Sequence, residues 1–75
     1  SAWAQNKLGY MYDLGVGVEE NNYKAVKWYR KSANKGNDSA QYNLALMYQS
    51  GEGVDKSIST AIKWHKKSAE QGNEG

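Results

Sequence analysis

The sequence predicts an all-α fold in which αα-hairpin repeats stack into a right-handed helical solenoid, an alpha-alpha superhelix. Three observations carry this prediction: a 36-residue internal repeat, apolar residues at helical spacing, and glycines where helices should end. The chain has 75 residues, which is enough for one small domain made of two such repeats.

The repeat emerges when residues 1–36 are aligned with residues 37–72. Fifteen of the 36 aligned pairs are identical, which chance does not produce in so short a chain. The identities fall in helices and loops alike, for example Leu8 with Leu44 and Gly15 with Gly51. We therefore expect a first helical repeat over 1–36 and a second over 37–72, with 73–75 starting a further repeat register.

The first helix of each repeat is predicted from its apolar face and its end signals. In the first repeat it covers residues 4–14, and its apolar face consists of Ala4, Leu8, Met11 and Tyr12. Gly15 follows as a C-terminal cap. In the second repeat, Asp38 and Ser39 are suitable N-caps for the equivalent helix.

The second helix of the first repeat is predicted over residues 22–35, capped by Asn21 or Asn22 and ended by Gly36. Its apolar face consists of Ala25, Val26, Trp28, Tyr29 and Ala33. Small residues should let neighbouring helices approach, and Leu8, Tyr12 and Trp28 should fill the space between them. Short turns make successive helices antiparallel.

These residues also carry a family resemblance. The second repeat reads A-Q-Y-N-L-A-L-M-Y-Q-S-G-E-G-V over Ala40–Val54 and A-I-K-W-H-K-K-S-A-E-Q-G over Ala61–Gly72. It resembles the Sel-one-like repeat (SLR) family, a relative of the tetratricopeptide repeat with a longer glycine-bearing loop. The first repeat resembles the family equally well. The resemblance implies an adaptor that holds proteins together or presents a concave groove to a peptide.

Composition argues against several classes of function. The absence of cysteine excludes disulfides, thiolate metal sites and thiol nucleophiles, and it is compatible with any compartment, so localisation stays unknown. No apolar run is long enough for a membrane span, and no signal-peptide pattern is present in these residues. A net charge of +2 is too small to indicate a nucleic-acid partner.

Two sequence features could be mistaken for parts of a nucleotide-binding or catalytic site. The Gly15-Val16-Gly17-Val18 loop lacks the third glycine of a dinucleotide fingerprint, so we interpret it as a helix-to-helix turn. His65, the only histidine, could touch Ser68 on a helix, but no third group orients the pair. We therefore predict no enzyme, and no catalytic, cofactor-binding or metal residues.

Eight of the ten lysines and arginines lie on the second helices, on the predicted outward face. This basic ridge comprises Lys24, Lys27, Arg30, Lys31, Lys35, Lys63, Lys66 and Lys67. It could meet an anionic partner, but a solvated face that keeps the surface soluble explains it more simply. No aromatic residues are expected between these charges, so base stacking is not indicated.

The first helices carry a more variable outer face, with Asn6, Tyr10, Asp13, Tyr42, Leu46 and Gln49. By analogy with related solenoids, first helices line the concave side, where an exposed tyrosine and leucine would suit partner contact. The alternative is that these side chains simply pack on a neighbouring helix. We treat the six as a candidate partner-binding groove.

The two ends of the chain pose a separate question, because solenoid repeats bury their apolar faces against neighbours. Trp3, Ile62 and Trp64 are candidates for self-association at these ends. We therefore expect a non-enzymatic protein–protein interaction scaffold, whose partner is a peptide, another protein or further repeats. The alternative function is a structural protein whose copies stack head to tail into a filament or tube.

Overall fold

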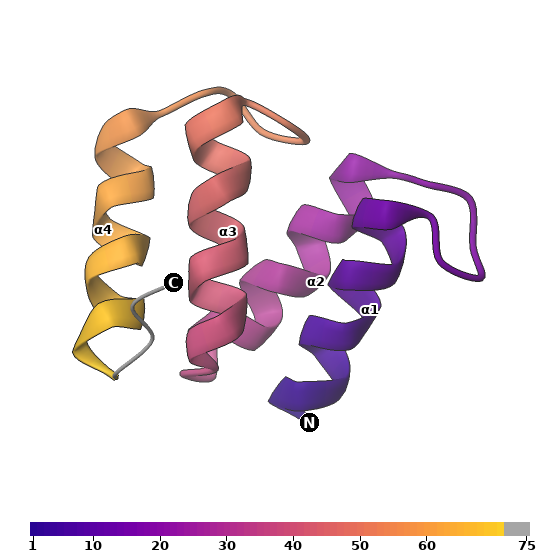
Figure 1. The fold of residues 1–75 in the computed structure, drawn as a ribbon, viewed down its shortest axis with the longest axis horizontal. Helices are drawn as coiled ribbons and strands as arrows, with labels where there is room; N and C mark the ends of the chain where they lie inside the picture. Colours follow the sequence, from indigo (N-terminus) through magenta and orange to yellow (C-terminus); the bar gives the residue numbers. More distant parts are fainter. Residues whose placement is uncertain (72–75) are drawn as a thin grey trace.

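The computed structural model describes residues 1–71, which form four helices and no strand (Figure 1). The helices are α1 (Ala2–Leu14), α2 (Asn22–Asn34), α3 (Asp38–Ser50) and α4 (Ile58–Glu70). The predicted all-α architecture of two repeated αα-hairpins is confirmed. Gly72, expected to end the last helix, and residues 73–75, expected to start a further register, lie outside the described residues.

Every helix begins at a side-chain cap that accepts a hydrogen bond from the backbone N–H three residues later. The four caps are Ser1, Asn21, Asn37 and Ser57. The prediction of Asp38 or Ser39 as the cap of α3 is wrong, because Asn37 accepts from the Ala40 N–H at 2.8 Å. Asp38 instead lies in the first turn, where the helix dipole favours a negative charge.

The loops that join the helices within each repeat have the same structure. Gly15 and Gly51 end α1 and α3 in the left-handed conformation, with φ of 70° and 76°, which costs glycine no steric strain. The Asn21 N–H then donates to the Tyr12 carbonyl at 2.8 Å, and the Ser57 N–H to the Tyr48 carbonyl at 3.0 Å. These bonds support the interpretation of each loop as a helix-to-helix turn.

Inside each repeat, a serine near the end of the second helix bonds to the start of the first. Ser32 Oγ donates to the Ala2 carbonyl, and Ser68 Oγ donates to the Asp38 carbonyl at 2.9 Å. Both serines are buried, and each also satisfies a carbonyl at the start of the first helix. The two repeats therefore share this serine-to-carbonyl hydrogen bond as well as an apolar face.

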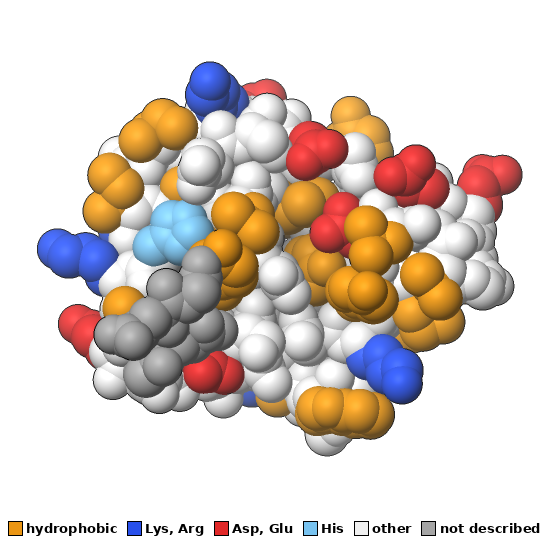
Figure 2. Space-filling view, viewed as in Figure 1, with side chains coloured by type: hydrophobic (Ala, Val, Ile, Leu, Met, Phe, Trp, Pro, Cys, Tyr) orange, Lys and Arg blue, Asp and Glu red, His pale blue; other side chains and the backbone are white. Residues whose placement is uncertain are grey.

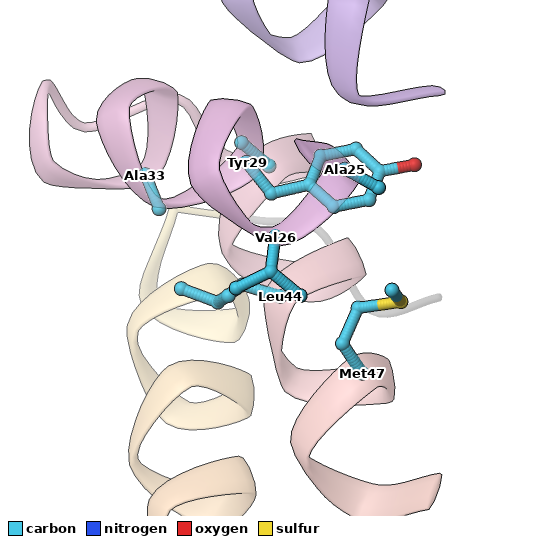
Figure 3. Close-up of a cluster of buried hydrophobic side chains, with 7 residues drawn as sticks. Ala25, Val26, Tyr29, Ala33, Leu44 and Met47 are labelled. Carbon is cyan, nitrogen blue, oxygen red and sulfur yellow. The ribbon is translucent and has the colours of Figure 1, made fainter. Parts of the chain in front are cut away.

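The main core lies between the repeats, where α2 packs on α3 (Figure 3). Its buried residues are Ala25, Val26, Tyr29, Ala33, Ala40, Leu44 and Met47. Val26 points from α2 toward Leu44 of α3, and Leu44 is fully buried. Complete burial of a leucine side chain contributes about 1.5–3 kcal/mol, so this contact is a major part of what holds the repeats together.

The tryptophans lie nearer the surface than their place on the predicted apolar face suggests. Trp28 and Trp64 are half-buried, and Trp64 packs against the edge of the core. The Lys31 and Lys27 ammonium groups lie 4.9 Å and 5.9 Å from the Trp28 ring centroid, and Lys67 lies 5.4 Å from that of Trp64. Tyr29 and Leu44, rather than the indoles, are the largest fully buried apolar side chains. The indoles thus support lysine side chains at the rim of the core.

Candidate functional site: the α1/α3 face

The six predicted groove residues all lie on the first helices of their repeats, three on α1 and three on α3. We call this surface the α1/α3 face; it comprises Asn6, Tyr10, Asp13, Tyr42, Leu46 and Gln49. Tyr10 is 51% exposed, Leu46 is 39% exposed, and Gln49 is also exposed. The other three, Asn6, Asp13 and Tyr42, are half-buried, so the face has three exposed and three partly covered side chains.

The half-buried residues are held by partners inside the molecule. Asn43 Nδ2 donates to Asn6 Oδ1 at 3.3 Å, which connects α3 directly to α1 across the repeat boundary. Asp13 accepts a hydrogen bond from the Tyr29 hydroxyl at 3.0 Å. Burial of Tyr29, together with the adjacent Asp13 carboxylate, raises the pKa of this phenol well above its usual value. Tyr29 therefore remains a neutral donor to Asp13 at ordinary pH.

The second repeat replaces this tyrosine–aspartate pair with a histidine–glutamine pair. His65 Nε2 lies 3.2 Å from Gln49 Oε1, at the positions equivalent to Tyr29 and Asp13. The His65 ring also meets the Tyr42 ring edge-on, with centroids 5.3 Å apart. The sequence favours a surface or half-buried structural histidine over a nucleophile partner, and in the structure His65 is half-buried and contacts two residues of the α1/α3 face. The sequence does hold a sign of this contact: Tyr29 and Asp13 of the first repeat are both replaced in the second, by His65 and Gln49.

The surface around the histidine is poor in positive charge (Figure 2). Hydrophobic and uncharged side chains fill its centre, acidic groups are scattered over it, and Lys and Arg side chains reach it only near its edges. The histidine contacts Tyr42 and Gln49, so this view includes the second-repeat end of the α1/α3 face. Such a surface suits an apolar side chain flanked by neutral or basic groups.

The basic ridge differs from the prediction at one residue. Its seven lysines are exposed, but Arg30 is half-buried. The Arg30 guanidinium donates to the Tyr48 hydroxyl at 2.8 Å and lies 5.6 Å from the centre of that ring. Arg30 therefore joins α2 to α3, a role that its place among lysines concealed. The half-buried tryptophans under Lys27, Lys31 and Lys67 also correct the expectation that no aromatic residue lies along this ridge.

The candidate self-association residues differ from one another in exposure. Trp3 and Ile62 are exposed, whereas Trp64 packs against the core. Trp3 carries the Lys7 ammonium group 5.1 Å from its ring centroid. Ile62 lies on the outer side of α4, at the position that Val26 occupies on α2. Of the three candidates, Trp3 and Ile62 are therefore exposed to solvent, whereas Trp64 is partly covered by its own chain.

The structure also shows how the side chains considered for catalysis and metal binding are arranged. His65 bonds to Gln49 while Ser68 donates to the Asp38 carbonyl, so these bonds direct the two side chains to different partners. Within residues 1–71, no group of three His, Asp or Glu side chains is arranged to hold a metal ion. None of the helices in this part of the chain has the length and apolar character needed to cross a membrane.

The two αα-hairpins have matching caps, loops and serine-to-carbonyl hydrogen bonds, and they stack through α2 and α3. These features define a helical-repeat protein of the solenoid class. The Sel1 repeat family model matches residues 4–37 and 38–73, which is nearly the whole chain. The chain belongs to the Sel1 repeat family. The family resemblance inferred from the glycine loop and the tryptophan-containing helix is therefore confirmed.

Relatives share this fold at substantial identity. A Sel1 repeat protein from Oxalobacter formigenes is 48% identical with a TM-score of 0.93, over 95% of this chain and 29% of its own. A protective antigen of uropathogenic Escherichia coli with an SLR fold is 45% identical with a TM-score of 0.94, over 97% of this chain and 16% of its own. Cysteine-rich protein B of Helicobacter pylori is 27% identical with a TM-score of 0.93, over 99% of this chain and 56% of its own.

One curated relative also matches, the sel1-like repeat-containing protein L21 of Acanthamoeba polyphaga mimivirus. It is 52% identical over 40 residues, which is 53% of this chain and 8% of that protein. The chain thus spans only a small part of L21 and less than two thirds of each structural relative described above. Repeats of this type generally serve as non-enzymatic scaffolds for protein interactions.

Proposed function

We propose that the chain is a non-enzymatic interaction module that binds a peptide segment of a partner protein on the α1/α3 face. The observation that carries the proposal is the exposure of Tyr10 and Leu46 on two helices whose polar neighbours are already fixed. Because Asn6, Asp13 and Tyr42 have intramolecular contacts, a ligand would meet a preformed surface. A preformed surface lowers the ordering cost of binding.

The chemistry of the face defines the ligand class. An apolar side chain of the peptide would pack between Tyr10 and Leu46, and aromatic residues often dominate such contacts. The exposed Gln49 amide can bond to the peptide backbone, and the acidic groups near the face favour a neutral or basic peptide. Catalysis has no part in the proposal, because His65 and Ser68 bond to separate structural partners.

A peptide-display selection tests the proposal directly. Peptides would be selected from a random library on the wild-type chain and then titrated against Tyr10→Ala, Leu46→Ala and the matched outer-surface control Lys27→Ala. Each substitution on the α1/α3 face should weaken binding by about 5- to 30-fold, the effect of losing a contact worth about 1–2 kcal/mol. The control should bind like the wild type. A selection that enriches no peptide, or peptides sensitive only to Lys27→Ala, would contradict the proposal.

A further inference from the structure

The contact between the two repeats has two halves, and α1 carries a second copy of the α3 half. The α3 residues that face the preceding repeat are Ala40, Gln41, Leu44, Met47 and Tyr48. The same five residue types occupy the equivalent places on α1, namely Ala4, Gln5, Leu8, Met11 and Tyr12. On α3 the first four are buried, whereas all five are only half-buried on α1. The surface of α1 that is equivalent to the contact surface of α3 is therefore present and only partly covered.

The α2 half of the contact recurs on α4. Val26 is 5% exposed beneath α3, whereas Ile62, at the equivalent position, is 52% exposed. Ala33 is buried, whereas its equivalent Ala69 is exposed. At these two positions the residue types are the same or differ by one methylene group, whereas Tyr29 of the same buried cluster has His65 as its equivalent. At the Val26 and Ala33 positions, the outer side of α4 thus keeps the apolar character with which α2 packs on α3.

The polar contacts of the interface also have equivalents at the ends. Gln41 Nε2 donates to the Ala33 carbonyl at 3.2 Å, and Gln5 could donate in the same way to an Ala69 carbonyl. Arg30 donates to the Tyr48 hydroxyl, and Lys66 could donate to a Tyr12 hydroxyl. The two ends are therefore complementary in hydrogen bonding as well as in apolar shape.

The glycine loop supplies an independent observation. A Cβ atom at Gly53 would collide with the Asn22 carbonyl oxygen, because this loop of the second repeat lies directly on the start of α2. At the equivalent Gly17, a Cβ would meet only Met11 within 4 Å, at 3.8 Å. The space beside Gly17 is open, and it is the space that the start of α2 fills beside Gly53.

We propose that α4 of one copy of this chain docks on α1 of a second copy in the geometry with which α2 docks on α3. The contact joins two different surfaces, so it is heterologous and each added copy exposes a new α4. Trp3 has no place in it, because its equivalent Ser39 is exposed rather than buried between the repeats. Trp64 already packs against the edge of the core that α2 and α3 form. Ile62 is the candidate end residue that the contact uses.

A single helix-to-helix contact is small, so the association should be weak, with a Kd on the order of 0.1–1 mM. NMR translational diffusion suits this range, and the wild-type chain should diffuse more slowly as its concentration rises from about 0.02 to 2 mM. Growth should continue without a plateau at the dimer, since the contact does not close.

Two variants block one end each. Ile62→Glu places a charge on the exposed outer side of α4 and blocks the α4 end. Ala4→Glu blocks the α1 end and suits the helix, because a glutamate three residues after the Ser1 cap completes a capping box. Leu46→Glu is the matched control, since it adds the same charge on the α1/α3 face instead of at an end. Circular dichroism checks that each variant is folded.

The decisive experiment mixes the two blocked variants. Each alone should remain monomeric at 2 mM, whereas an equimolar mixture should form dimers and stop there, because one open α4 meets one open α1. Leu46→Glu should associate like the wild type. The proposal is overturned if the wild type stays monomeric over the whole range. It is equally overturned if a blocked variant associates alone, or if the mixture of the two does not dimerise.

Discussion

Single residues in the two repeats differ in compensating pairs, and Gly9 with Tyr29 is the best defined of these. A Cβ atom at Gly9 would lie 2.5 Å from Cδ1 of the Tyr29 ring, so only glycine fits beneath this tyrosine. The second repeat has Ala45 and His65 at the same positions, a larger residue on α3 with a smaller ring above it. The total volume is thereby roughly kept, which buried interfaces require.

Gly9→Ala should therefore destabilise the protein despite its better helix propensity. Overpacking typically costs about 1–3 kcal/mol, whereas alanine gains about 1 kcal/mol over glycine in a helix. The Tyr29 ring cannot move freely, because its hydroxyl is bonded to Asp13. Urea unfolding should show a lower free energy of unfolding for the variant. The same substitution in a Tyr29→His background should cost less, and strictly additive effects would contradict the pairing.

Tyr29 should also make stability depend on pH in the alkaline range. Burial and the Asp13 carboxylate raise its pKa in the folded state above the usual value of about 10. The unfolded chain therefore loses this proton first, so the contribution of Tyr29 is complete below pH of about 10 and is lost progressively above it. Thermal unfolding followed from pH 8 to 11 should show this decline. The Tyr29→Phe variant should show a shallower decline, and an identical pH profile would count against this origin.

At the scale of the helices, the boundaries follow from local rules that the sequence displays openly. Side-chain caps start the helices, and left-handed glycines end α1 and α3. These signals place α2 within one residue of its predicted range. The start of α3 was misplaced because Asn37, Asp38 and Ser39 are three successive residues that all favour capping.

The Asn37 cap offers a test at this scale. Asn37→Ala should lower the free energy of unfolding by about 1 kcal/mol, because the Ala40 N–H loses its acceptor at a half-buried helix start. Asn34→Ala is the matched control, since Asn34 is exposed at the end of α2 and is not a cap. Chemical denaturation of both variants would compare the two. A loss as large for Asn34→Ala would show that capping is not the cause.

Contacts between helices were harder to predict than the helices themselves. Arg30 could not be told from the neighbouring lysines, because a 36-residue comparison pairs it with Lys66 and gives no sign of Tyr48 as a partner. The burial of Gln41 is equally hard to predict, since its amide donates to the Ala33 carbonyl of the preceding repeat, which the sequence does not place beside it. The candidate α1/α3 residues were located by helical spacing, but their partners Asn43, Tyr29 and His65 come from other helices or from the next repeat.

At the scale of the whole molecule, the two repeats share one buried core, which α2 and α3 form together. The same sequence pattern gives a half-buried leucine in the first repeat and, where α2 packs on α3, a buried leucine in the second. This dependence on neighbours is the property that defines a solenoid. The same dependence accounts for the difference in exposure between Val26 on α2, at 5%, and Ile62 on α4, at 52%.

Comparison of Leu44→Ala with Leu8→Ala by urea unfolding tests this account most directly. Leu44 is fully buried against α2, whereas Leu8, at the same position in the first repeat, is only half-buried. The account predicts a loss of about 2–5 kcal/mol for Leu44→Ala and a clearly smaller loss for Leu8→Ala, in a single cooperative transition for the wild type. Equal losses, or two separate transitions, would contradict a shared interior.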